Sequence, residues 1–268
     1  MKKPIKILII VFLIIGVLAV AGFLIVPNIL IYRSCKEATE KSDFTYTEWD
    51  RRSLGTLENH QTITVEGITA DIPDYMHTRE YLIKDGDSED SKEFKRRMYV
   101  DTKNMSEEDG PAYEKHMIMF DKAHTEKYDS DSDLLESIDK KTQERFLKKQ
   151  GKEKMESMYD FYDLAYSLDC SKVNIFSSKE CALLMYYSMV RSISVPSVTN
   201  TVYRIEDDSF KGFVETLEKD NGNMYSVYMY EKADPEQVHC VRIFDIEQSD
   251  SSKETVYKII NSLTLAED

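Results

Sequence analysis

An apolar run at residues 7–26 constrains this chain more than any other feature, because it contains no charged or strongly polar side chain. A helix rises about 1.5 Å per residue, so a run of this length spans about 30 Å, the thickness of the hydrocarbon core of a bilayer. Three lysines precede the run, and Pro27 and Asn28 interrupt the apolar sequence after it. We therefore predict that residues 1–32 form a short cytoplasmic tail and a transmembrane anchor.

The same residues leave a cleaved signal peptide open as an alternative. Ala19-Val20-Ala21 fits the small-x-small pattern of a cleavage site. Cleavage there would leave the apolar segments 23–26 and 29–32 at the start of a soluble protein, which favours an uncleaved anchor. A lipoprotein fits less well, because Arg33 lies two residues before Cys35 and an arginine is foreign to a lipid-attachment box.

The charges that flank the anchor predict its orientation. The short basic tail before the run favours the cytoplasm, and large domains translocate largely regardless of their own charge. We therefore predict a single-pass protein of the cell membrane whose soluble domain faces outside. Residues 33–60 lack a sustained apolar period and are predicted to be a stalk, and residues 61–268 are predicted to be the soluble domain.

The part of the chain after Tyr32 is strongly acidic. It holds all 49 acidic residues and 32 of the 35 basic ones, which gives it a net charge of −17. Nucleic acid needs clustered Lys and Arg to replace its counterions, so this charge predicts no nucleic-acid partner. The ordinary effect of such a charge is solubility.

Alternating apolar residues predict strands at both ends of the soluble domain. Residues 61–65 and 68–72 flank Glu66-Gly67 and predict two strands or one bulged strand. A half-exposed strand is predicted at residues 94–100, and the apolar run at 116–120 predicts another. Further strands are predicted in this order: residues 202–205, 213–217, 224–230 and 238–244, with Asn221-Gly222 at the tip of a hairpin.

Helical spacing dominates residues 131–195, which we predict to be a helical block inserted in the domain. Met155, Met158, Tyr159, Tyr162, Ala165 and Tyr166 recur at intervals of three and four and predict a core face. Ser177 with Glu180 predicts a capping box for a helix whose apolar face carries Ala182, Leu183, Tyr186, Met189 and Val190. A second box, Ser251 with Glu254, predicts a closing helix with Val256, Ile259, Ile260 and Leu263 on one face.

Together these elements predict an α+β fold, in which an antiparallel sheet is packed with helices. Three segments resemble the PsbP-like family, the fold of a photosystem extrinsic subunit and of a Ran-binding import factor. They are the strand ending in Ile-Pro at residues 67–73, the three-stranded meander, and the final helix with its sequence at residues 259–263. The resemblance covers about 100 residues and implies an α/β/α sandwich that works as a binding or assembly module, without shared catalytic residues.

The sequence provides no catalytic, cofactor-binding or metal-binding residue that we can name. It lacks a phosphate-binding glycine loop, a nucleophile elbow, an H-E-x-x-H string and a Cys-x-x-Cys pair. Residues 129–133 alternate acidic side chains as calcium loops do, but the glycine and glutamate that an EF-hand needs are missing. The five histidines are scattered, and we expect them at the surface or at strand edges. Cys35 is expected next to the membrane, and Cys170, Cys181 and Cys240 in the folded part, with buried free thiols as the expected state.

These observations favour a membrane-anchored, extracytoplasmic binding or assembly module without catalytic activity. Its expected partners are the membrane, through the N-terminal helix, and another envelope protein. The alternative is an envelope-associated hydrolase whose site is assembled from distant acidic and histidine residues. Two carboxylates about 5 to 10 Å apart in a deep cleft would support that alternative.

Overall fold

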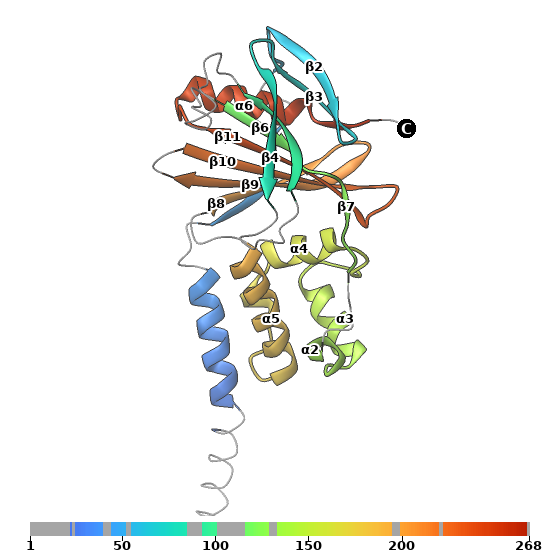
Figure 1. Cartoon of the computed structure of the whole chain (residues 1–268). Coiled ribbons are helices and arrows are strands. Elements are labelled where there is room, and N and C mark those ends of the chain that lie inside the picture. The colour runs from blue at the N-terminus through green and yellow to red at the C-terminus, as the bar shows by residue number, and fades with distance from the viewer. Residues whose placement is uncertain are drawn as a thin grey trace, which may run out of the picture. The chain divides into compact units, whose positions relative to one another are not determined.

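Figure 1 shows a computed structural model of the chain, which divides into two compact units. The structure describes residues 22, 25–39, 44–51, 55–84, 93–100, 116–128, 133–194, 199–219 and 222–266. The helical unit comprises Met1–Asp43, Asp129–Glu156 and Asp160–Ser194. The sheet unit comprises Phe44–Tyr128, Ser157–Tyr159 and Val195–Asp268. The fold is therefore mixed α+β with a large sheet, as predicted.

The sheet unit is built on a sheet of nine described strands, in the order β1-β8-β9-β10-β11-β6-β5-β4, with β7 paired to β11 beside this path. β1 runs parallel to β8, and the other neighbours are antiparallel. The strands are β1 (Thr45–Glu48), β4 (His77–Lys84), β5 (Glu93–Val100), β6 (His116–Phe120), β7 (His124–Thr125), β8 (Thr199–Glu206), β9 (Phe210–Lys219), β10 (Gly222–Glu231) and β11 (Gln237–Asp245). The predicted C-terminal meander is thus β8 to β11.

A three-stranded sheet and a helix cover one face of the large sheet (Figure 1). The small sheet has the order β12-β3-β2, from β2 (His60–Val65), β3 (Ile68–Pro73) and β12 (Thr264–Leu265), and the helix is α6 (Asp250–Ser262). Their apolar side chains form one core with residues of the large sheet, and the predicted α6 face is fully buried there. That face is Val256, Ile259, Ile260 and Leu263.

Two glycines allow close approaches in the sheet unit. Gly67 and Glu66 both have positive φ, 76° and 52°, which gives the tight turn between β2 and β3. Gly212 of β9 lies very close to the backbone of its neighbour β10, because a Cβ added there would be 1.9 Å from the carbonyl oxygen of Tyr228. A side chain at position 212 would therefore push the two central strands apart.

The helical unit contains a helix over residues 25–39 and the elements α2 to α5. These are α2 (Asp133–Glu136), α3 (Lys140–Lys149), α4 (Met158–Tyr166), the 3-10 turn η1 (Cys170–Lys172) and α5 (Ser178–Ser194). The first residues of α4 are counted with the sheet unit. Aromatic rings fill the space between the helices: Phe146 stacks on Tyr187 at 5.9 Å, and Phe161 lies 5.7 Å from Tyr187. Of the apolar face predicted over residues 155–166, Tyr159, Ala165 and Tyr166 are buried, whereas Met155, Met158 and Tyr162 are only partly buried.

Several details differ from the sequence predictions. The helix continues through Pro27 and reaches residue 39, and β1 joins the large sheet, so the segment predicted as a stalk contributes to both units. β5 is not half-exposed at its end, since Met98, Tyr99 and Val100 are all buried. These three side chains pack into clusters on both sides of the strand.

The buried face of α5 also differs from the predicted one. Cys181, Leu184 and Tyr187 are buried, whereas Met189 is 54% exposed. The α6 cap is Ser249, whose side chain accepts a hydrogen bond from the Ser252 amide, and not Ser251. Polar and apolar residues are closely interspersed in both segments. A buried face of α5 or a cap of α6 that is shifted by one or two positions therefore fits the same sequence.

The predicted transmembrane segment, residues 7–26, lies almost entirely outside the described residues, as do the acidic stretch 129–132 and the loop 85–90. None of the helices within the described ranges combines the length and the apolar character needed to cross a bilayer.

Candidate functional site

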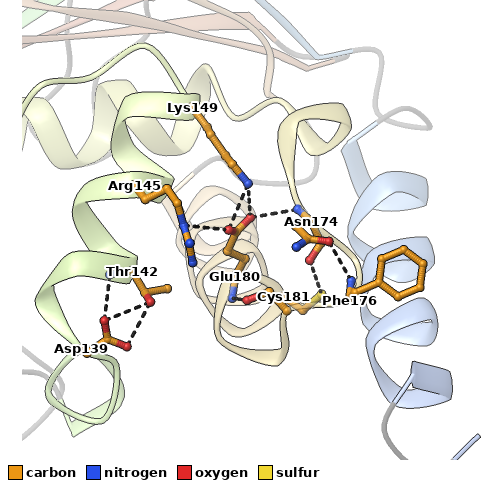
Figure 2. Close-up of polar contacts among 9 residues, drawn as sticks. Asp139, Thr142, Arg145, Lys149, Asn174, Phe176, Glu180 and Cys181 are labelled. Carbon is orange, nitrogen blue, oxygen red and sulfur yellow. Dashed lines mark hydrogen bonds and ion pairs between the residues drawn. The ribbon is translucent and has the colours of Figure 1, made fainter. Parts of the chain in front are cut away.

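The buried carboxylate of Glu180 organises the polar centre of the helical unit (Figure 2). Its side chain is 1% exposed, and its two oxygens lie 3.0 and 2.7 Å from the Lys149 ammonium nitrogen. The backbone N–H of Asn174 donates to the same carboxylate at 2.9 Å, and Arg145 Nε lies 3.5 Å away. A buried charge with these partners is stable, because every contact replaces a contact with water that burial removes.

The local sequence explains only part of this geometry. The Glu180 amide donates to the Ser177 hydroxyl at 3.3 Å, so the predicted capping serine is in place. The glutamate side chain does not complete the box at the Ser177 amide, because that amide donates to the carbonyl of Asn174. Glu180 instead turns toward α3, where Lys149 lies in the last turn. The capping-box prediction is therefore correct for Ser177 and wrong for the side chain of Glu180.

The end of α3 contacts three other segments of the helical unit through neighbouring polar residues. Lys149 pairs with Glu180 at the start of α5. Gln150 exchanges two hydrogen bonds with the backbone of Asp169, at 3.1 and 3.0 Å. Lys152 forms an ion pair with Asp163 of α4. We name this set (Lys149, Gln150, Lys152, Glu180, Asp163 and Asp169) the α3 polar hub. Both of its buried carboxylates, Glu180 and Asp163, are paired with an ammonium group, an arrangement suited to holding helices together.

A second polar contact joins the other end of α3 to α5. Asp139 caps α3 by accepting from the Thr142 amide at 3.0 Å, and Lys179 donates to it at 2.6 Å. The Lys179 ammonium, followed by the hydrogen bonds from Thr142, lowers the pKa of Asp139 to about 2. The carboxylate therefore stays charged under all ordinary conditions.

Residues 25–39 pack against the helical unit through three polar side chains. Asn28 is buried and donates to the Ser178 hydroxyl at 3.3 Å. Cys35 is buried, and Thr39 Oγ1 lies 3.4 Å from Cys170 Sγ. Burial raises the pKa of the Cys35 thiol, against a lowering by the Ser188 hydroxyl. The helix that follows the apolar run is thus part of the folded helical unit.

The cysteines are buried thiols, as predicted for Cys170, Cys181 and Cys240, and Cys35 is buried in the folded helical unit as well. All four are free and buried in the structure. Burial raises the pKa of Cys181, with further increases from the charge of Glu180 and from Cys35, and burial raises the pKa of Cys240 to about 12. A thiol that stays protonated is a poor nucleophile, so these side chains are suited to packing.

In the sheet unit, His116, Ser252 and Asp245 form a buried chain. Ser252 Oγ donates to an oxygen of Asp245 and lies 3.0 Å from His116 Nε2. A hydrolytic triad needs the histidine in the middle, where it can accept the serine proton. Here the serine is in the middle and its proton is already donated to the aspartate. The chain links β6, β11 and the first turn of α6, which is a structural role.

The histidines differ in part from the expectation of surface or edge positions. His60 and His124 are partly exposed, but His116 and His239 are buried. His239 Nε2 lies 2.7 Å from Glu231, and its Nδ1 lies 3.3 Å from the carbonyl oxygen of Glu66. This histidine therefore joins β11 to the turn between β2 and β3. Sequence reasoning missed the contacts of His116, His239 and Glu180, since their partners lie far away along the chain.

No metal-binding group of three or more His, Cys, Asp or Glu side chains occurs within the described ranges. Comparisons of the chain with protein-family models, with curated proteins and with solved structures found no match. The PsbP-like resemblance therefore stays a prediction. Its three segments, β3, the strands of the meander and α6, lie in the sheet unit.

Proposed function

We propose that this chain is a single-pass membrane protein of the cell envelope whose two folded units face outside and act as a binding or assembly module. One observation supports the proposal most strongly: the helix that directly continues the apolar run is built into the helical unit by Asn28, Cys35 and Thr39. A membrane span that continues into a folded unit in this way fixes that unit at the membrane surface. A flexible stalk would instead let the unit move away from the surface.

The polar side chains of the described residues support a binding module over an enzyme. In the α3 polar hub, Lys149 and Lys152 neutralise the buried carboxylates. In the sheet unit the buried serine donates to Asp245. These groups are occupied in holding elements together. The acidic surface, with a net charge of −17 after Tyr32, favours a partner that presents a basic surface.

Membrane anchoring is tested on the full chain in cells. Two arginines in the apolar run, I14R/I15R, are expected to release the protein from membranes washed in alkaline carbonate, since each arginine at the centre of a span costs about 2.5 to 3.5 kcal/mol. The matched control is S34R/A38R, which adds the same charge to exposed positions of helix 25–39. Equal retention of I14R/I15R and the wild type would contradict the anchor.

Orientation and partner are tested on the same cells. Protease added outside is expected to degrade the folded units, and full protection would reverse the orientation. Crosslinking of the tagged chain in intact cells, followed by mass spectrometry, is expected to recover an envelope protein at a near-equal amount. Recovery of the chain alone would argue against the assembly role.

A further inference from the structure

Exposed apolar side chains occur at the start of helix 25–39 and just before α5. Val26 and Leu30 of helix 25–39 are 51% and 59% exposed, and Phe176, just before α5, is 70% exposed. The Phe176 loop is held in shape, because the Phe176 amide donates to the Asn174 side chain at 3.1 Å. Figure 2 shows the ring pointing toward the side on which the N-terminal helix lies. An exposed phenylalanine in an ordered loop is a feature that a fold in water alone does not require.

The hydrogen bond between Asn28 and Ser178 sets the level of this loop along the N-terminal helix. Asn28 lies two residues after the end of the apolar run, a rise of about 3 Å. Phe176 lies two residues before Ser178 in the chain. The ring is therefore within about one helical turn of the point where the apolar run ends.

α5 and helix 25–39 run in the same direction. Near the start of α5, Ser178 contacts Asn28. Ten residues farther along α5, Ser188 forms a hydrogen bond with the thiol of Cys35, which lies seven residues after Asn28. Figure 1 shows the two helices side by side, with their axes in a similar direction. Met189, eleven residues beyond Ser178, therefore lies about 16 Å farther from the end of the apolar run. Phe176, just before α5, and Met189, within α5, are thus exposed apolar side chains at very different distances from that point.

We propose that the Phe176 loop is a membrane-contact site that inserts into the interfacial region of the phospholipid bilayer, next to Val26 and Leu30. Aromatic side chains are favoured at that depth, and the buried apolar area adds to the binding. The acidic side chain that contacts this loop, Glu180, accepts from the Asn174 amide and is paired with Lys149, so it opposes the contact little. The inference rests on the proposed anchoring, which it deepens: the helical unit would be held against the bilayer at two points.

Tryptophan fluorescence of the full chain in phosphatidylcholine nanodiscs tests this contact. Lipids brominated near the headgroup quench a tryptophan that enters the interface. The wild type, whose single tryptophan is Trp49, gives the baseline. Phe176→Trp adds an exposed probe, Met189→Trp is the matched control in α5, and Leu13→Trp reports on the apolar run. We expect the added emission of Phe176→Trp to be mostly lost in headgroup-brominated lipid and that of Met189→Trp to be retained.

The outcomes separate this inference from the anchoring. Added emission that is retained at position 176, with quenching of Leu13→Trp by lipids brominated along the chain, would overturn the contact and leave the anchor standing. That result would also be seen if a second copy of the chain or another protein covered Phe176. Emission retained at position 13 in every lipid would contradict the anchor itself. Equal quenching at positions 176 and 189 would also overturn a site confined to the loop.

Discussion

The sheet unit and the helical unit are stabilised by different kinds of contact. The sheet unit encloses one large apolar core between its two sheets and α6, and its buried histidines, His116 and His239, link neighbouring elements. The helical unit contains helices joined by buried ion pairs and by the hydrogen bonds of the α3 polar hub. Apolar burial scales with area and tolerates small shifts, whereas a buried charge depends on one or two particular partners. The two units should therefore respond differently to single substitutions.

The largest effect is expected in the core of the sheet unit. Ile259→Ala removes a fully buried side chain from α6 and should lower the free energy of unfolding by about 2 to 5 kcal/mol. Trp49 reports on this unit, since its ring lies 5.0 Å from Tyr257 and its Nε1 donates to Asn261 of α6. Urea unfolding followed by Trp49 fluorescence measures the change. Glu254→Ala, at an exposed position of the same helix, is the control and should change the midpoint little.

The sheet unit was also the part that the sequence predicted best. Alternation located β2, β3, β5 and strands of the meander, and an apolar run located β6, whose five residues are all buried. The helix α6 was predicted with its buried face, since four apolar residues recur at helical spacing. β1 and β4 were missed because their polar residues obscure the alternation, and their pairing depends on distant strands.

The second largest effect is expected in the helical unit, at the buried carboxylate of Glu180. Glu180→Gln preserves the shape of the side chain and removes its charge, which leaves Lys149 without its carboxylate and should cost about 1 to 3 kcal/mol. Hydrogen exchange should rise at amides of α3 and α5. The Trp49 transition should move less than it does for Ile259→Ala, because the substitution lies in the helical unit.

The control for this prediction is Glu144→Gln, which removes a carboxylate from an exposed position of α3. If both variants raised exchange equally, the effect would belong to net charge and the α3 polar hub would have no special role. If Glu180→Gln moved the Trp49 transition as far as Ile259→Ala, the two units would unfold together and the comparison would fail.

The polar hub could not be predicted from the sequence for a physical reason. A capping box describes contacts within four residues, and Ser177 does cap α5. The side chain of Glu180 finds a stronger partner 31 residues earlier in the chain, at Lys149. Many lysines could serve as that partner in a chain this rich in charge, and only the packing of α3 against α5 selects one. The same limit applies to His116 and Ser252, which are 136 residues apart.

A smaller effect is expected from the cap of α6 in the sheet unit. Ser249→Ala removes the acceptor of the Ser252 amide and should cost about 0.5 to 2 kcal/mol. Ser251→Ala is the matched control, because Ser251 was the cap predicted from sequence but is not the one observed. Urea unfolding followed by Trp49 should place the midpoint of Ser249→Ala below that of Ser251→Ala. A lower midpoint for Ser251→Ala than for Ser249→Ala would show that Ser251, the cap predicted from sequence, is the one that stabilises α6.

The smallest effect concerns Asp139, the exposed cap of α3 in the helical unit. Its pKa is lowered from 3.8 to about 2 by Lys179 and Thr142, so its charge stabilises the fold above pH 4, and that contribution is lost as the pH falls toward 2. Asp139→Asn retains a capping side chain but loses the attraction of Lys179. Hydrogen exchange of α3 should therefore be slightly faster in Asp139→Asn than in the wild type at pH 5, and the two should converge near pH 2. A difference that persists unchanged at pH 2 would show that the charge of Asp139 contributes nothing, and that the change acts through cap geometry alone.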